Sequence, residues 1–167
     1  MESILVSSCL MGQAVRYDGS DKKSHHRIVQ RWLSEGRIVS VCPEVAGGLP
    51  IPRPAAEIVG GAGWSVLAGS AKVMDAAAHD VSSAFVQGAQ QALAIATKKG
   101  IRIAVLKEGS PSCGSSFIYD GTFSGNKLAD MGVTAALLQQ AGLHVFSENE
   151  LELADALLQQ WEAQAVL

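Results

Sequence analysis

The sequence predicts an α/β fold: a single Rossmann-like domain with a mainly parallel sheet flanked by helices. Short apolar runs alternate along the chain with longer segments of helical periodicity, which is typical of a parallel sheet built from strand–helix–strand units. The length of 167 residues fits one domain. We therefore treat residues 1–167 as a single α/β domain. A third observation is that each of the three cysteines follows an apolar run.

The first half of the chain begins with two predicted strands, residues 3–8 and 38–41, which are short apolar runs of the kind that form buried strands. Between them, apolar residues spaced three to four apart predict a helix that starts near Ser24 and ends at Gly36, since glycine commonly follows the last helical turn. Residues 42–54 then hold four of the five prolines. Because proline fixes φ and lacks an N–H donor, this segment is expected to be a rigid loop, neither helix nor central strand.

The second half starts with a hairpin-like excursion over residues 56–75, where short apolar pieces are separated by glycines. A long helix follows, with Asp80 as its N-cap and Gly100 at its end. Residues 101–106 form the next buried strand. The remaining elements are a strand and turn over 117–123, a helix over 132–142, a strand at 144–146 and a terminal helix over 147–161.

The composition excludes several classes of protein. Apolar residues make up 48% of the chain and charged residues 17%, which indicates a compact globular protein. The net charge of −3 argues against nonspecific binding to nucleic acid or to an anionic membrane. No apolar run approaches the roughly 18 residues of a membrane span, and no basic region precedes the first apolar run as in a signal peptide. We expect a cytoplasmic protein with no nucleic-acid partner and no membrane contact.

The three cysteines, Cys9, Cys42 and Cys113, all fall at the carboxyl end of a predicted strand. The carboxyl ends of parallel strands meet at one edge of the sheet, where ligands bind in open α/β folds. In a reducing compartment three cysteines do not form a disulfide framework, and an odd number leaves one unpaired. One such cysteine is as readily explained as a small buried hydrophobe as by a functional site. Three in equivalent positions predict a shared site.

Three thiolates can hold a metal and leave one coordination position open, which distinguishes catalytic from structural metal sites. Soft thiolates select zinc, Cu(I) or an iron–sulfur cluster. The cysteines are too far apart in sequence to form the short Cys-x-x-Cys pairs of zinc ribbons or ferredoxins. A metal site therefore requires that the fold bring the three cysteines together.

Two charged residues near these cysteines are further candidates. Glu44 follows Cys42 by two residues on the proline-rich loop, so it is a candidate general acid/base, or else an exposed carboxylate. Arg16 follows the first cysteine and is either an anchor for an anionic or carbonyl-bearing ligand or a solvated surface charge.

Several motifs together resemble the bacterial thiouracil desulfidase (TudS-like) family, over nearly the whole chain. They are Ser8-Cys9-Leu10-Met11-Gly12, Arg16-Tyr17-Asp18-Gly19, Cys42-Pro43-Glu44, Gly47-Gly48-Leu49, Pro52-Arg53-Pro54, Ser110-Pro111-Ser112-Cys113-Gly114, Ile118-Tyr119-Asp120-Gly121, Gly132-Val133-Thr134-Ala135-Ala136 and Val145-Phe146-Ser147-Glu148. The resemblance implies a [4Fe-4S] cluster held by Cys9, Cys42 and Cys113. It also implies that the free iron takes the sulfur of a thiolated pyrimidine, and that water attacks the carbon without net redox to give uracil and sulfide.

The resemblance places Glu44 and Ser110 at the positions assigned to proton transfer in that family. We assign Ser112, Arg16 and Asp18 as candidate substrate-binding residues. The expected partner is a small-molecule thiolated base, and a homodimer is left open. Two other functions also stay open: a non-catalytic protein that binds a metal or a cluster, and a metal-free thiol enzyme that uses a low-pKa cysteine as nucleophile.

Overall fold

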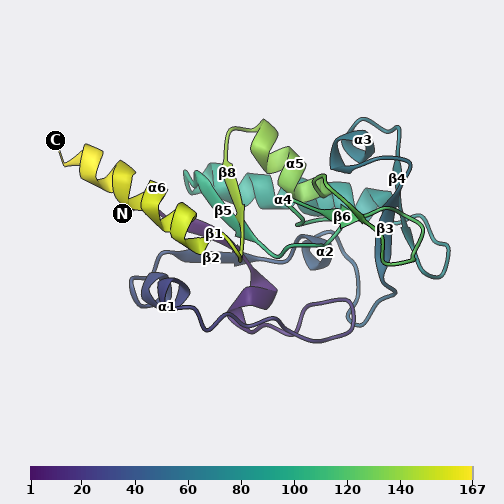
Figure 1. Cartoon of the computed structure of the whole chain (residues 1–167), viewed down its shortest axis with the longest axis horizontal. Coiled ribbons are helices and arrows are strands. Elements are labelled where there is room, and N and C mark those ends of the chain that lie inside the picture. The colour runs from purple at the N-terminus through teal and green to yellow at the C-terminus, as the bar shows by residue number, and fades with distance from the viewer. Residues whose placement is uncertain (167) are drawn as a thin grey trace.

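Four short parallel strands form the central sheet of the computed structural model, which describes residues 1–166 (Figure 1). The strands are arranged in the order β2-β1-β5-β8. Their bounds are β1 Ile4–Ser7, β2 Ile38–Val41, β5 Ile103–Leu106 and β8 His144–Ser147. This confirms the α/β class with a parallel sheet flanked by helices.

The strand order places a topological switch point between β1 and β5. The chain leaves β1 to form β2 on one side, and later forms β5 on the other side of β1, with Val6 paired to both Ser40 and Val105. Loops that leave two such strands diverge at their carboxyl ends and open a crevice there, which is where ligands bind in this class of fold. The loops after β1 and β5 carry Cys9 and Cys113.

Both faces of the sheet are covered by helices because alternate residues of a strand point to opposite faces. Ile4 and Val6 pack in one core with residues of α1 and α6. Leu5 packs on the other face with residues of α4 and α5. The bounds are α1 Arg27–Ser34, α4 Ser82–Lys98, α5 Val133–Gln140 and α6 Leu151–Ala165.

A second part of the molecule extends from the sheet on the right of Figure 1. It contains an antiparallel pair of strands, β3 and β4, joined through helix α3, and a two-stranded ribbon, β6–β7. Helix α4 runs lengthwise from the parallel sheet to this part. Its Phe85 and Ala89 pack with Ile58 of β3 and Val73 of β4 in a third core. The bounds are β3 Ala56–Val59, α3 Gly63–Leu67, β4 Lys72–Asp75, β6 Ile118–Tyr119 and β7 Lys127–Leu128.

Several predicted boundaries were wrong. The proline-rich loop contains a short helix, α2, at Pro43–Ala46, because proline is tolerated at the first helical position, where its missing N–H has no intrahelical partner. The apolar piece Trp64–Leu67 is helical and belongs to α3. Helix α1 starts at Arg27 and not near Ser24, because the Ser24 N–H bonds to the Leu10 carbonyl and holds that segment against the first loop.

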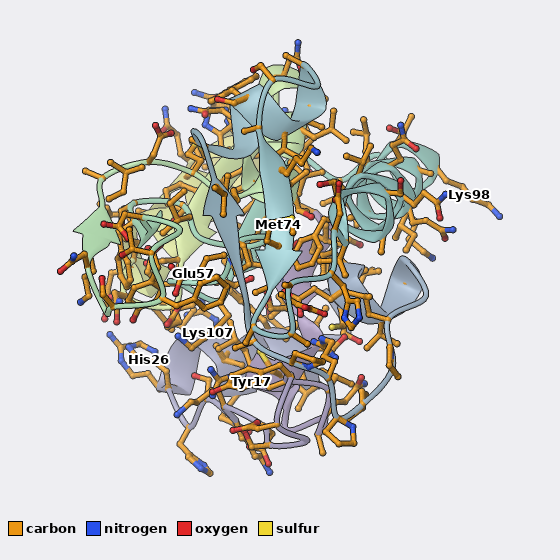
Figure 2. All side chains as sticks on the ribbon, turned by 90° about the vertical axis from the view of Figure 1, so that its right-hand side faces the viewer. Tyr17, His26, Glu57, Met74, Lys98 and Lys107 are labelled. Carbon is orange, nitrogen blue, oxygen red and sulfur yellow. The ribbon has the colours of Figure 1, made fainter. Side chains whose placement is uncertain are left out.

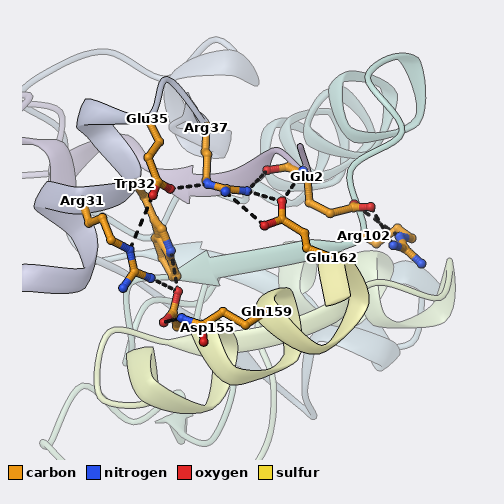
Figure 3. Close-up of polar contacts among 9 residues, drawn as sticks. All are labelled: Glu2, Arg31, Trp32, Glu35, Arg37, Arg102, Asp155, Gln159 and Glu162. Atoms are coloured by element: carbon orange, nitrogen blue, oxygen red, sulfur yellow. Dashed lines mark hydrogen bonds and ion pairs between the residues drawn. The ribbon is translucent and has the colours of Figure 1, made fainter. Parts of the chain in front are cut away.

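A polar network ties α6 to the amino end of the sheet (Figure 3). Arg37, just before β2, pairs with Glu35 and with Glu162 of α6. Asp155 of α6 accepts a hydrogen bond from Trp32 Nε1 at 2.9 Å and pairs with Arg31. The Arg37 hydrogen bond lowers the pKa of Glu162 to about 2. Because Arg37 precedes its strand, the network lies at the edge opposite the cysteines.

Within residues 1–166, no helix is both long enough and apolar enough to cross a membrane.

Candidate functional site

A cavity of about 740 Å³ lies at the carboxyl edge of the parallel sheet. One side is formed by the loops that follow β1, β2 and β5. The other side is formed by the β3–β4 hairpin and the segment around β6 and β7. Figure 2 views the molecule from the hairpin end and labels Tyr17, Glu57 and Lys107, which line the cavity.

All three cysteines line this cavity, as the sequence predicts. Cys9 lies in a 3-10 turn, Ser8–Met11, directly after β1. Cys42 follows β2 and occupies the N-cap position of α2. Cys113 lies in the loop after β5. No disulfide joins them, and Cys9 and Cys113 are buried.

Burial makes the three groups poor acids in the absence of a metal. It raises the pKa of the Cys9 thiol to about 11, with a further increase from Cys42, while Arg16 and Lys107 oppose the shift. Burial also raises the pKa of Cys42 and of Cys113. A metal-free thiol enzyme needs a cysteine with a lowered pKa, so this environment does not suit that alternative.

The residues present fit a cofactor with soft ligands. Cysteine thiolates are the usual protein ligands of an iron–sulfur cluster. Three free cysteines on separate loops, facing one cavity, fit such a group.

Glu44 lies in the first turn of α2 and is held in place by Arg53. The Arg53 guanidinium donates to Glu44 Oε2, with its Nε at 2.9 Å, and also donates to the Val15 carbonyl at 3.0 Å. The side chain of Arg53 is only 5% exposed. Arg53 belongs to the Pro52-Arg53-Pro54 motif, and no role for it was predicted from the sequence. A buried arginine must be paired, and its position nine residues after Glu44 was not enough to identify the partner.

Ser110 connects Glu44 to the third cysteine. Its hydroxyl donates to Glu44 Oε1 at 3.3 Å and accepts the backbone N–H groups of Ser112 and Cys113 at 3.0 and 3.1 Å. The two residues assigned to proton transfer are therefore in direct contact, beside two of the three cysteines.

The three candidate substrate-binding residues lie in different environments. Arg16 lines the cavity. Ser112 is fully buried, and its hydroxyl bonds to that of Thr134 at 2.7 Å, so it anchors the loop to α5. Asp18 is exposed, and its carboxylate accepts the N–H and hydroxyl of Ser20 within a turn. The structure thus brings Arg16 to the cavity, but neither Ser112 nor Asp18.

Glu108 is a site residue that was not predicted from the sequence. Its buried carboxylate accepts the backbone N–H groups of Ser115, Ser116 and Phe117 and the hydroxyls of both serines. Burial alone raises the pKa of Glu108, but the hydrogen bonds outweigh it and the net shift is downward. The ionised carboxylate therefore fixes the segment after Cys113. An acidic residue two positions after a buried strand and before a serine-rich loop was the available signal.

Comparisons with known proteins identify the family of the chain. The 2-thiouracil desulfurase family model matches residues 4–150. The "Uncharacterized protein YbbK" of Bacillus subtilis (strain 168) is 51% identical over 148 residues, which cover 89% of this chain and 97% of that protein. A solved structure described as the [4Fe-4S]-dependent thiouracil desulfidase TudS superposes with a TM-score of 0.87 at 45% identity, covering 96% of this chain and 99% of that one. The chain therefore belongs to the 2-thiouracil desulfurase family of enzymes.

Proposed function

We propose that the protein removes sulfur from a thiolated pyrimidine, converting thiouracil to uracil and sulfide. The observation that carries this proposal is that three free cysteines and the Glu44–Ser110 pair share one cavity. The similarity to the TudS structure and to the family model supports it. The proposed substrate is a small-molecule base, and the reducing cytoplasm is the proposed location.

Cys9, Cys42 and Cys113 are the residues proposed to hold a [4Fe-4S] cluster. When bound by three cysteines, such a cluster supplies one iron without a protein ligand, a soft Lewis acid suited to a thiocarbonyl sulfur. Arg16 and Lys107 line the same cavity, and their positive charges favour the thiolate form of Cys9.

The reaction balances without a redox partner. Water supplies the oxygen that replaces sulfur on the ring carbon, and its two protons leave with the sulfur as hydrogen sulfide. Glu44 is proposed to move a proton from the water to the departing sulfur, a role typically worth about 10²–10⁴-fold in rate. Ser110 orients the Glu44 carboxylate through Oε1, while Arg53 holds Oε2. Arg16 is proposed to contact the substrate.

The test is an anaerobic assay of the purified protein with 2-thiouracil and with 4-thiouracil. The expected result is release of uracil and sulfide in equal amounts, with no added reductant or oxidant. A protein that contains iron and sulfide but does not turn over either base would be a non-catalytic cluster-binding protein. A colourless protein that is equally active without iron would be a metal-free thiol enzyme.

A further inference from the structure

The cavity concentrates the aromatic side chains of the chain. Of the six phenylalanine and tyrosine residues, five line it: Tyr17, Phe85, Phe117, Tyr119 and Phe123. Such rings offer flat, apolar surfaces on which a planar heteroaromatic ring can stack. The aromatic wall comes mainly from the second part of the molecule, not from the cysteine loops.

Most of these rings already have a partner. Phe117 packs edge-on against Tyr119, with ring centroids 6.0 Å apart, and Lys127 lies over its face. Tyr17 has the Arg16 guanidinium over its ring, and Phe85 is buried in the third core. Among the described residues, no aromatic pair or cation–π contact involves Phe123, and 42% of its surface is exposed. Phe123 therefore combines an exposed apolar surface with a place in the cavity wall.

The backbone holds Phe123 in a conformation that it does not adopt readily. Its φ is 55°, in the left-handed region, which is unfavourable for a residue with a bulky side chain. Strain of this kind persists only where the surroundings enforce it, and it is common at ligand sites.

Two contacts with β3 enforce this conformation. Glu57 Oε1 accepts the backbone N–H groups of Gly121 and Phe123, at 3.0 and 3.1 Å. Gly121 lies so close to β3 that an added Cβ would come within 2.5 Å of the Ile58 carbonyl oxygen. The turn is thus fixed to the hairpin, with Phe123 at the edge of the cavity.

We propose that Phe123 is a specificity-determining residue that stacks on the pyrimidine ring of the substrate. The inference rests on the proposed function, because that function defines the substrate. In this proposal the β6–β7 turn selects a planar ring. The cysteine loops on the other side of the cavity carry out the reaction.

The experiment compares Phe123→Ala, Phe123→Leu and Phe123→Trp in the anaerobically purified, cluster-loaded protein. Phe123→Ala is expected to raise KM for thiouracil about 5- to 30-fold, the lower part of the range for losing one base–aromatic stack, because the ring is partly exposed. The kcat is expected to stay within about twofold, since stacking stabilises bound substrate and transition state alike. Phe123→Trp is expected to retain affinity, and Phe123→Leu to behave like the alanine variant.

Binding of uracil, the proposed product, gives a second readout that needs no turnover. Calorimetric titration is expected to show the same 5- to 30-fold weakening in Phe123→Ala. The matched control is Leu128→Ala, because Leu128 is also an exposed apolar residue of the ribbon but does not line the cavity. It is expected to leave both KM and uracil binding unchanged.

The outcomes separate this inference from the proposed function. An active wild type with unchanged KM and uracil affinity in Phe123→Ala overturns the stacking role alone. Full affinity in Phe123→Leu also overturns it, because any apolar side chain would then suffice. A wild type that binds uracil without releasing sulfide overturns the proposed function, and weaker uracil binding by Phe123→Ala still supports stacking. A wild-type protein that neither binds uracil nor releases sulfide would contradict both the stacking role and the proposed function.

Discussion

At the scale of single residues, the site depends on two polar contacts that lock one carboxylate between a cysteine loop and a buried cation. Glu44 accepts from Ser110 on one oxygen and from Arg53 on the other. The carboxylate therefore has little freedom to rotate, and a proton carrier works best when its position is fixed before the substrate binds. We propose that Arg53 is a positioning residue that acts through Glu44.

Replacing Glu44 with glutamine tests its role as proton carrier. Glu44→Gln keeps the size of the side chain and an oxygen acceptor but removes the carboxylate. The kcat for sulfide release is expected to fall by roughly 10²–10⁴-fold, while iron content and the cluster absorbance stay at the wild-type level. Glu152→Gln, on the exposed surface of α6, is the matched control and is expected to have wild-type kinetics. Unchanged turnover in Glu44→Gln would remove this residue from the mechanism.

The contacts of several site residues could not be predicted from the sequence, because their partners are distant along the chain. Placing the three cysteines at one sheet edge required only that each follow a strand. Ser112 was assigned to substrate binding, but its hydroxyl bonds to Thr134, which is 22 residues away. The roles of Arg53 and Glu108 depend on partners across loops, and no local pattern marks them.

At the scale of elements, the position of Glu44 depends on how closely α2 approaches α4. The two helices meet at glycines: an added Cβ on Gly88 would lie 1.9 Å from the Pro43 carbonyl oxygen, and one on Gly47 would lie 2.0 Å from the Ala84 carbonyl oxygen. Backbone atoms cannot move aside as a flexible side chain can. Any larger residue would therefore push α2, and Glu44 with it, away from α4.

Whether Gly88→Ala raises or lowers the free energy of unfolding distinguishes the effect of this close contact from the effect of helix propensity. Propensity alone would make alanine in a helix more favourable by about 1 kcal/mol, whereas overpacking typically costs about 1–3 kcal/mol. Gly88→Ala is expected to lower the free energy of unfolding by about 1–2 kcal/mol and also to lower kcat, because α2 carries Glu44. The control Gln90→Ala, at an exposed position of the same helix, should be near neutral. A stabilised, fully active Gly88→Ala would contradict the tight contact.

The sequence predicted the strands and long helices better than the short elements. Runs such as 101–106 carry a strong apolar signal because both faces of the sheet are buried. The short helices α2 and α3 have only one turn, so no periodicity can develop, and tertiary contacts decide their conformation. The hairpin predicted over residues 56–75 was confirmed as the antiparallel strands β3 and β4. The piece between these two strands is the helix α3.

At the scale of the whole molecule, the cavity and the main ion-pair network lie at opposite edges of the sheet. The network around Arg37 and Glu162 contributes to stability, not to the site (Figure 3). Helices α4 and α5 contribute to the core on the sheet and to the core under the hairpin. The chain is therefore proposed to unfold as one domain, in a single transition seen alike by circular dichroism and tryptophan fluorescence.

The pKa of Glu162 predicts how stability changes with pH. Its pKa falls from 4.5 to about 2 on folding, because of the Arg37 hydrogen bond. A lowered pKa contributes stability above the unfolded value, and this contribution is lost as the pH falls from about 5 towards 2. Glu162→Gln should therefore be less stable than wild type at pH 7, by about 1 kcal/mol, the upper value for partly exposed ion pairs. Denaturant melts should show the difference between the two proteins shrinking steadily as the pH falls from about 5 towards 2. A difference that stays constant over this range would contradict the ion-pair origin.

The central claim is that Cys9, Cys42 and Cys113 together hold the cluster on which desulfuration depends. The most direct measurement is iron and acid-labile sulfide per chain in the anaerobically reconstituted wild type and in the three single Cys→Ser variants, with a circular dichroism melt of each. The account predicts about four iron and four sulfide per wild-type chain. It predicts loss of most of both in every variant, with a folded protein in each case, because the apolar cores do not need the metal. Full iron and sulfide content in any one of the three folded variants would contradict the three-cysteine site.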